Sequence, residues 1–342
     1  MLWGKSPRVK LSISKLKSPR HILFISAFHT PFIQEDLDFL SKHFSVKTLI
    51  GNGVRQALKI LISVRASDIV FCWFASTYSA LAVLAARFLG KRSVIVIGGV
   101  DVAKEPDLNY GMFLSLWKSA LVRYAIRNSD KVLLVDESLR SETISRVGYE
   151  GRNIETVPTG YDTSFWKLKG TKRTEVLCVA VAMDEKRARL KGIDILVEAA
   201  RSLSRTKFTV VGVRESAVGK FNPPKNIRFI APIEQSELLP FYQKAKVYCQ
   251  PSLREGLPNT LCEAMLCQCI PVATTVGGMP EAVGNAGFLV PPKDARALLK
   301  AIQRALSASA KHGVLARKRI AENFPAAKRQ VALLKILEGF QT

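Results

Sequence analysis

The chain has 342 residues, and 51 lysines and arginines against 28 aspartates and glutamates give it a formal net charge of +23. A chain of this length is too long for one compact hydrophobic core, which favours two domains. No apolar run approaches the roughly twenty residues that a transmembrane helix needs, and no apolar signal-peptide core follows the N-terminus. The sequence therefore predicts a soluble or peripheral protein.

The first twenty residues form a basic arm that precedes the first predicted strand. Residues 1–20 contain six basic and no acidic side chains, and Trp3, Leu11, Ile13 and Leu16 are interleaved with them. A basic segment with scattered apolar residues can dock on anionic lipid. A disordered terminus explains the same composition equally well.

The first half of the chain predicts strands that alternate with helices. In chain order, the predicted elements lie at residues 21–26, 33–43, 67–73, 79–89, 93–97, 111–128 and 131–135. This alternation is typical of a doubly wound parallel sheet, so we expect residues 21–165 to form a Rossmann-like domain. The helix at 111–128 carries Lys118, Arg123 and Arg127 among many apolar groups. We interpret that helix as core packing, with a border on a lipid acceptor as the alternative.

The second half repeats the alternation and contains two motifs with chemical meaning. Strands are predicted at residues 176–182, 208–212, 227–231, 245–250 and 270–273. The pair Lys191-Gly192 precedes an apolar-periodic helix in this half, and Asp184 to Leu190 form a charged segment before it. The last predicted helix begins near residue 326. No internal repeat is visible.

A glutamate pair eight positions apart is the most informative motif. The loop Glu255-Gly256-Leu257-Pro258 precedes a helix predicted from Asn259 to about Cys267, and Glu263 lies one turn inside that helix. Free backbone N–H groups at Asn259 and Thr260, together with the helix dipole, suit a diphosphate. The two carboxylates suit sugar hydroxyls. One solvated and one helix-capping carboxylate would be the alternative explanation.

The order of these pieces resembles the donor site of a known enzyme family. The Glu-Gly-Leu-Pro loop, the Glu-Ala-Met helix and the later Gly277-Gly278 turn with Pro280-Glu281 are similar to the E-x7-E element of retaining glycosyltransferases of family 4, group 1. This resemblance implies the GT-B fold, in which two Rossmann-like domains face a central cleft. It implies boundaries near residues 21–165 and 166–325, with residues 326–342 crossing back to the first domain. Pro158 and Gly160 would then lie on the hinge side of the cleft.

The resemblance also assigns roles in donor binding. Lys191 would bring a cation to the donor phosphates, and Arg187 or Arg189 would supply a second, although spacing does not distinguish the two arginines and both also fit solvated loop positions. Glu263 would hold the ribose hydroxyls, and Glu255 would hold hydroxyls of the transferred sugar. Backbone N–H groups around Gly256, Leu257 and Pro258 would orient that sugar.

The first domain departs from the family pattern. Many members have a histidine after the strand that ends here at Ile97, whereas this chain has Gly98-Gly99-Val100-Asp101. Gly99 permits a close backbone approach to the donor, and we expect Asp101 to take over hydrogen bonding to the sugar or acceptor. His29 is expected at a strand end facing the cleft, where it could contact the acceptor. A structural role for His29 is the alternative.

No metal site is predicted. Asp36 and Asp38 match an Asp-x-Asp metal motif, but the surrounding residues favour an amphipathic helix with its acidic face in water. The cysteines have no metal-ligand spacing and are expected to be buried thiols in a reducing cytosol. They are Cys72, Cys178, Cys249, Cys262, Cys267 and Cys269.

The implied function is a retaining, metal-independent hexosyltransferase without a cofactor. It would use a UDP- or GDP-linked sugar and act on a hydroxyl of a lipid-linked or cell-envelope glycan. The basic composition favours a cytoplasmic protein that is peripheral on the inner face of the membrane and contacts an anionic membrane surface. A soluble acceptor is the alternative. A basic nucleic-acid-binding protein is a further one, but no nucleic-acid motif is present and no nucleic-acid partner is expected. A dehydrogenase is set aside because no Gly-x-Gly-x-x-Gly follows a strand.

Overall fold

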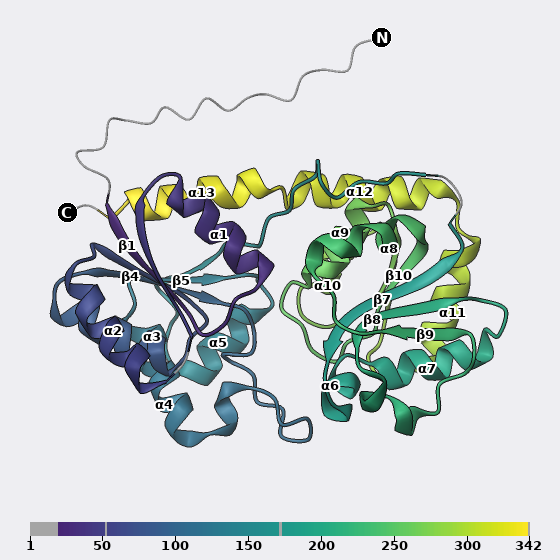
Figure 1. Cartoon of the computed structure of the whole chain (residues 1–342), viewed down its shortest axis with the longest axis horizontal. Coiled ribbons are helices and arrows are strands. Elements are labelled where there is room, and N and C mark those ends of the chain that lie inside the picture. Colours follow the sequence, from purple (N-terminus) through teal and green to yellow (C-terminus); the bar gives the residue numbers. More distant parts are fainter. Residues whose placement is uncertain (1–19, 52, 171–172, 341–342) are drawn as a thin grey trace, which may run out of the picture.

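The computed structural model describes residues 20–51, 53–170 and 173–340, which form two Rossmann-like domains side by side (Figure 1). Nearly all of the basic arm lies outside the described residues. The first domain is built on a parallel sheet of six strands in the order β2-β1-β3-β4-β5-β6. These strands are β1 (His21–Ser26), β2 (Ser45–Ile50), β3 (Ile69–Trp73), β4 (Arg92–Ile97), β5 (Lys131–Leu134) and β6 (Ile154–Thr156).

Helices cover both faces of the first sheet. The connection from β1 to β2 runs in one direction across the sheet, and the later connections run in the other. Because such connections are right-handed, α1 (Pro31–Ser41) lies on one face of the sheet and the helices of the later connections lie on the other. Helix α3 packs between α2 and α4 on the second face, and α5 packs against α4. Their bounds are α2 (Val54–Arg65), α3 (Thr77–Phe88), α4 (Leu116–Asn128) and α5 (Leu139–Val147).

The second domain has the same architecture. Its parallel sheet has the order β12-β11-β10-β7-β8-β9. The strands are β7 (Glu175–Ala182), β8 (Phe208–Val213), β9 (Ile227–Ile230), β10 (Ala245–Gln250), β11 (Ile270–Thr274) and β12 (Phe288–Val290). The helices are α6 (Glu185–Leu190), α7 (Ile193–Ser202), α8 (Leu239–Lys244), α9 (Asn259–Leu266), α10 (Met279–Val283) and α11 (Ala295–Ser307).

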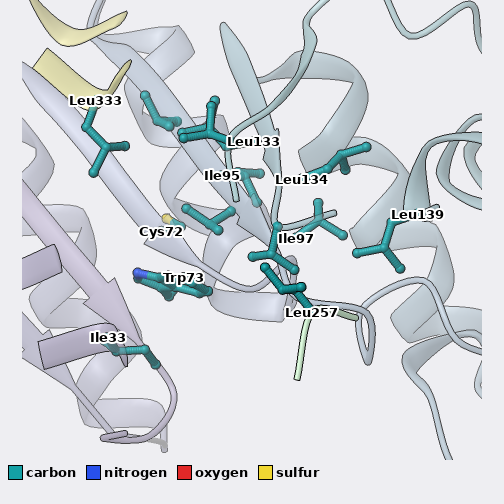
Figure 2. Close-up of a cluster of buried hydrophobic side chains, with 14 of the residues drawn as sticks. Ile33, Cys72, Trp73, Ile95, Ile97, Leu133, Leu134, Leu139, Leu257 and Leu333 are labelled. Carbon is teal, nitrogen blue, oxygen red and sulfur yellow. The ribbon is translucent and has the colours of Figure 1, made fainter. Parts of the chain in front are cut away.

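The chain returns to the first domain at its end. Helix α12 (Ala310–Asn323) packs on α9 and α10 of the second domain, and α13 (Ala326–Glu338) continues over the first domain along the same side of the molecule (Figure 1). Between the two helices, Pro325 pairs with Tyr161 of the interdomain segment. Leu333 of α13 joins the buried cluster that also contains Ile95 and Leu133 of the first sheet (Figure 2).

Asp36 is buried, so the prediction of an acidic face in water is wrong for this residue. Arg329 of α13 donates to both of its oxygens, at 2.7 and 2.6 Å, and the Trp73 indole N–H donates to Oδ2 at 2.9 Å. The cause is α13, which covers this side of α1 and cannot be inferred from the period of α1 itself. Asp38 is exposed, as expected, and accepts a hydrogen bond from Gln34 at 2.5 Å.

The single helix predicted at 111–128 is interrupted. A 3₁₀ turn (Met112–Leu114) comes first, and Ser115 is extended before α4 begins. Phe113 is buried, whereas Leu116 and Trp117 at the start of α4 are exposed. Core packing therefore explains only part of this apolar segment.

All six cysteines are buried free thiols, as predicted. Within the described residues, no helix is both long and apolar enough to cross a membrane.

Candidate active site

A cavity of about 310 Å³ lies between the two domains, at the carboxyl ends of strands from both sheets. In open α/β sheets, ligands bind at this edge. Its first-domain wall includes Phe32, Trp73, Phe74 and Gly98. Its second-domain wall is formed by the ends of β7 and β10, by Lys191 and by the donor loop with the start of α9, residues 255–260.

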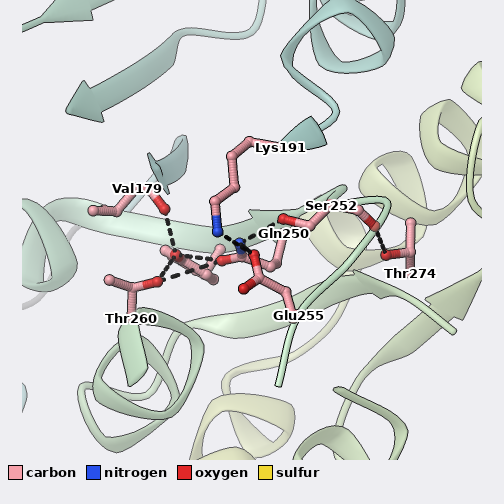
Figure 3. Close-up of polar contacts among 8 residues, drawn as sticks. Val179, Lys191, Gln250, Ser252, Glu255, Thr260 and Thr274 are labelled. Carbon is pink, nitrogen blue, oxygen red and sulfur yellow. Dashed lines mark hydrogen bonds and ion pairs between the residues drawn. The ribbon is translucent and has the colours of Figure 1, made fainter. Parts of the chain in front are cut away.

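Lys191 and Glu255, to which the sequence assigned separate roles in donor binding, form an ion pair in this cavity. The Lys191 Nζ atom lies 2.7 Å from Glu255 Oε1, and Gln250 donates to the same oxygen at 3.1 Å (Figure 3). Gly192 makes this position possible. It has φ = +68°, and a Cβ there would collide with the carbonyl of Pro251, so only glycine lets α7 start this close to the donor loop.

A polar network fixes the side chain of Gln250 beside Glu255. The Tyr248 hydroxyl lies 2.8 Å from Gln250 Oε1 and 2.8 Å from Thr260 Oγ1, while Gln250 Nε2 donates to Ser252 Oγ at 2.9 Å (Figure 3). Thr274 of β11 donates to the Ser252 carbonyl at 2.5 Å. Because these groups are almost all buried, the network holds the amide of Gln250 in one orientation toward the Glu255 carboxylate.

The N-terminus of α9 opens into the cavity without a side-chain cap. Pro258 precedes the helix and provides no capping group, so the first backbone N–H groups, those of Asn259 and Thr260, have no acceptor among the described residues. The Asn259 side chain instead accepts hydrogen bonds from the Thr159 hydroxyl (3.1 Å) and the Tyr161 hydroxyl (2.9 Å) of the interdomain segment. Uncapped N–H groups and the helix dipole make this end of α9 an anion site.

Glu263 does not line the cavity in this structure, and its predicted contact with ribose stays a prediction. It is 1% exposed and accepts hydrogen bonds from the Tyr242 hydroxyl (2.9 Å) and from the Gln235 amide. Tyr242 is fully buried, whereas Gln235 is only partly buried, in the loop before α8. Gln235 and Tyr242 therefore each donate to one oxygen of the Glu263 carboxylate.

The burial of Glu263 predicts a pH-dependent stability. Burial raises the pKa of this carboxyl to about 7, against the lowering effect of the hydrogen bonds from Gln235 and Tyr242. Between the unfolded value near 4.5 and about 7, the folded protein keeps a proton that the unfolded chain has lost. The contribution of this group therefore lowers stability as pH rises through that window, by about 3 kcal/mol at most.

We expect Glu263→Gln to reduce this fall in stability. The free energy of unfolding, measured in urea at pH 5 and at pH 8, should differ less between the two pH values in the variant than in the wild-type chain. The exposed Glu322→Gln on α12 is the matched control and should follow the wild-type chain. An equal pH dependence in wild type and Glu263→Gln would show that Glu263 titrates normally.

Asp101 is a structural residue, and its predicted contact with sugar or acceptor is wrong. Its side chain is fully buried, and its oxygens accept backbone N–H groups of Ala75 (3.2 Å), Gly98 (3.2 Å) and Gly99 (2.7 Å). Burial raises its pKa to about 6, against the lowering effect of these hydrogen bonds. Asp101 thus shapes the glycine turn after β4 and does not itself line the cavity.

The two candidate arginines are in different environments. Arg189 is exposed and pairs with Glu185 (3.0 Å) and Asp194 (3.3 Å). Arg187 has no ion-pair partner among the described residues, and its guanidinium stacks 4.8 Å from the ring centroid of Tyr110, which extends from the first domain. Burial raises the pKa of Tyr110, and the nearby charge of Glu255 adds to the shift. Arg187 is therefore the arginine of the two without a carboxylate partner among the described residues, and neither arginine lines the cavity.

Glycines let the two domains touch at the donor loop. A Cβ on Gly256 would lie 2.6 Å from the carbonyl oxygen of Gly98, so the two backbones are in direct contact. Gly99, with φ = +117°, also faces Gly256: a Cβ built on Gly99 would lie 3.7 Å from the Gly256 nitrogen. The sequence predicted that Gly99 lies on the donor side of the cleft, and in the structure it contacts the donor loop.

Leu257 and Arg254 anchor the donor loop to the first domain. Leu257 is 6% exposed and joins the first-domain core beside Ile97 (Figure 2). Arg254 donates to Glu105 at 2.9 Å and also to Glu142. Because both acids belong to the first domain, the position of Glu255 depends on how the domains close.

His29 does not reach the cavity. It is exposed, and its Nε2 lies 2.6 Å from Gln34 Oε1. Aromatic rings occupy the first-domain wall instead, with Phe32 and Trp73 5.1 Å apart between centroids and Phe74 beside them. Sequence reasoning missed this wall, although Trp73 ends a buried strand and Phe74 follows it, the place where ligands bind in such sheets.

Two Rossmann-like domains with a cavity between them form the GT-B architecture. Two family models match the chain, "Glycosyltransferase Family 4" over residues 44–165 and "Glycosyl transferases group 1" over residues 174–308. Together they cover most of the described residues. The chain belongs to glycosyltransferase family 4, group 1.

Individual relatives are distant. The chain is 22% identical over 226 residues to the phosphatidylinositol N-acetylglucosaminyltransferase GPI3 subunit of Saccharomyces cerevisiae, covering 62% of this chain and 48% of the relative. It is 26% identical over 213 residues to the MMP alpha-(1->4)-mannosyltransferase of Mycolicibacterium hassiacum, covering 56% and 51%. The match thus spans about half of these relatives. The fold is similar to that of Anabaena HepE in complex with UDP and glucose, with a TM-score of 0.76, 14% identity and coverage of 94% and 100%.

Proposed function

We propose that this protein transfers a sugar, with retention at the anomeric carbon, from a UDP- or GDP-linked donor to a hydroxyl of a lipid-linked or cell-envelope glycan. One observation carries the proposal: the Lys191–Glu255 pair faces the uncapped N-terminus of α9 inside a cavity between the domains. A cation, free N–H groups and a carboxylate are the groups that a sugar diphosphate requires.

The positive groups act on the leaving diphosphate. When the bond between the anomeric carbon and the β-phosphate oxygen breaks, its electron pair moves to that oxygen. Lys191 and the N–H groups of Asn259 and Thr260 are already in place to stabilise this charge, and such preorganised groups contribute a few kcal/mol each to the transition state. Arg187 is the second cation in this proposal and would turn from Tyr110 toward the diphosphate. The proposal requires no metal ion and no cofactor.

The acceptor attacks from the same face. In this mechanism the acceptor hydroxyl forms the new bond to the anomeric carbon on the side of the departing phosphate, and its proton passes to a phosphate oxygen. No protein nucleophile is needed. When the donor binds, the Lys191–Glu255 ion pair would break and Lys191 would turn to the diphosphate. Glu255 would then accept hydrogen bonds from hydroxyls of the transferred sugar. The ribose would displace the Gln235 amide and bind to Glu263.

The first-domain wall suits the acceptor. Phe32, Trp73 and Phe74 offer apolar ring faces opposite Glu255, and rings of this kind pack on the faces of sugars and on apolar chains. The name of the yeast relative refers to a phosphatidylinositol substrate, and HepE was solved with UDP and glucose. The HepE complex supports a nucleotide-sugar donor for this chain, and the name of the yeast relative supports a lipid-linked acceptor.

Calorimetric titration of the purified chain with UDP, GDP, ADP and NAD tests the donor. One nucleoside diphosphate should bind preferentially, in the presence of EDTA, and Lys191→Ala should weaken that binding. Arg205→Ala is the matched control, because Arg205 is exposed and lies outside the cavity. If no nucleotide binds, or if Lys191→Ala and Arg205→Ala bind alike, the proposed donor site is wrong.

A further inference from the structure

Three adjacent helices of the first domain expose an unusual number of large apolar side chains. Helices α2, α3 and α4 pack side by side on one face of the first sheet (Figure 1). Of the sixteen exposed large hydrophobic residues in the described part of the chain, nine lie on these helices or directly after α3. They are Leu58, Leu61, Ile62, Leu84, Phe88, Leu89, Leu116, Trp117 and Leu121, here called the α2–α4 face.

The exposure of this face is high, and the core does not need it. Phe88 is 90% exposed, Leu116 89%, Ile62 72% and Trp117 60%. The same helices bury other residues against the sheet, among them Ile60, Val83 and Val122. The exposed residues are therefore a second apolar surface of these helices. Exposed apolar side chains gathered on adjacent helices are typical of an interaction site.

The charge on these helices has one sign. Helices α2, α3 and α4 contain seven basic residues and no aspartate or glutamate. Arg55, Lys59, Arg65 and Lys118 have no ion-pair partner among the described residues. In contrast, α1 on the opposite face carries Glu35, Asp36 and Asp38.

We propose that the α2–α4 face docks on an anionic lipid bilayer, with its apolar side chains inserted among the acyl chains and its lysines and arginines at the headgroups. Helices with apolar residues bordered by basic ones bind membrane interfaces in this way. The positive charge and the apolar side chains of this face together argue against a second copy of the chain or a nucleic acid as its partner. A second copy would bring two basic faces together, and a nucleic acid would leave the apolar side chains in contact with phosphates and water.

The face adjoins the cavity through the chain itself. Gly98 lines the cavity just after β4, and the following segment carries Glu105 and Tyr110 to the second domain. This segment leads through the 3₁₀ turn Met112–Leu114 into α4. A docked α4 would therefore hold this side of the cleft near the bilayer. The docking rests on the proposed function: a lipid-linked acceptor would reach the cavity from the bilayer on which the α2–α4 face lies.

Vesicle flotation of the full chain tests the docking. The probes are vesicles of phosphatidylcholine alone and vesicles with about one third phosphatidylglycerol. The wild-type chain should float with the anionic vesicles and much less with the neutral ones, and added salt should weaken the binding. The variant Ile62→Glu/Phe88→Glu/Trp117→Glu should bind the anionic vesicles at least about tenfold more weakly.

Matched substitutions separate the face from general charge effects. Val314→Glu/Leu315→Glu changes two exposed apolar residues of α12, outside this face, and should bind nearly as well as the wild type. Tryptophan fluorescence of a Trp3→Phe chain gives a second readout because, of its three remaining tryptophans, Trp73 and Trp166 are buried while Trp117 is exposed. Anionic vesicles should shift the emission to shorter wavelength, and Trp117→Phe should remove most of that shift.

Several outcomes would overturn the docking surface. In flotation, they are an unchanged vesicle affinity of the triple variant or an equal loss of affinity in the α12 control. In fluorescence, the contradicting outcome is a full emission shift in Trp117→Phe. Tighter binding to duplex DNA than to anionic vesicles at equal salt, or self-association that the triple variant abolishes, would also contradict the proposal. None of these measurements uses a nucleotide. Failure of docking and failure of the donor site are therefore distinguished, since the triple variant should titrate with nucleoside diphosphate like the wild type.

Discussion

Lys191→Ala is expected to lower kcat/KM for sugar transfer by about a hundred- to a thousandfold. Lys191 is the cation that lines the cavity beside the start of α9, so its loss leaves the departing diphosphate with backbone N–H groups and a more distant arginine. Because the charge on the leaving group develops in the transition state, the effect should fall on kcat as well as on donor affinity. Initial rates with the donor identified by calorimetry provide the measurement.

Two further variants make this result specific. Arg189→Ala removes an exposed arginine that pairs with Glu185 and Asp194, and its rate should remain within about threefold of the wild type. Lys191→Arg keeps the charge but changes its shape, and should recover part of the activity. A Lys191→Ala chain that is folded and as active as Arg189→Ala would contradict the proposed role.

Asp36→Asn is expected to destabilise the folded chain by about 3 to 5 kcal/mol. The carboxylate and Arg329 are both nearly buried, with side chains 5% and 6% exposed, and the pair joins α1 to α13. Arg329 also donates to the carbonyl of Val157 at 2.6 Å and lies 5.3 Å from the Trp73 ring centroid. Neutralising Asp36 leaves a buried guanidinium without its counter-charge, which costs more than the ion pair itself contributes.

Urea unfolding followed by tryptophan fluorescence measures this effect, since Trp73 contacts both members of the pair. Asp38→Asn lies on the same helix but is exposed, and should change stability by less than about 0.5 kcal/mol. The double variant Asp36→Leu/Arg329→Met should recover much of the loss. Equal stabilities for Asp36→Asn and Asp38→Asn would show that the α1–α13 contact does not stabilise the fold.

The sequence predicted the parts of the site that lie close together in the chain. The Glu255 loop, the start of α9 at Asn259 and the Lys191-Gly192 pair before α7 follow from local spacing, whereas the sequence predicted a capping residue at the start of α9 and the structure has no side-chain cap there. Strands with continuous apolar runs, such as β4 and β5, were found within one residue of their observed ends. Buried parallel strands have this clear pattern.

The elements that were missed have weaker local signals. Strand β2 is an edge strand with a largely exposed, half-polar sequence, so it lacks the continuous apolar run of the inner strands. The predicted Asp101 contact failed because burial and three backbone donors depend on the turn after β4. Asp36 binds an arginine 293 positions away, and the aromatic wall requires β1 and β3 to be neighbours. Such contacts are set by topology, which local spacing does not contain.

A crystal structure with the preferred nucleoside diphosphate tests the central claim most directly. We expect a diphosphate oxygen within hydrogen-bond distance of Lys191 Nζ and of the backbone N–H of Asn259 or Thr260, and the ribose at Glu263 in place of the Gln235 amide. A nucleotide bound elsewhere, with the Lys191–Glu255 ion pair and the Gln235–Glu263 hydrogen bond intact, would contradict the account.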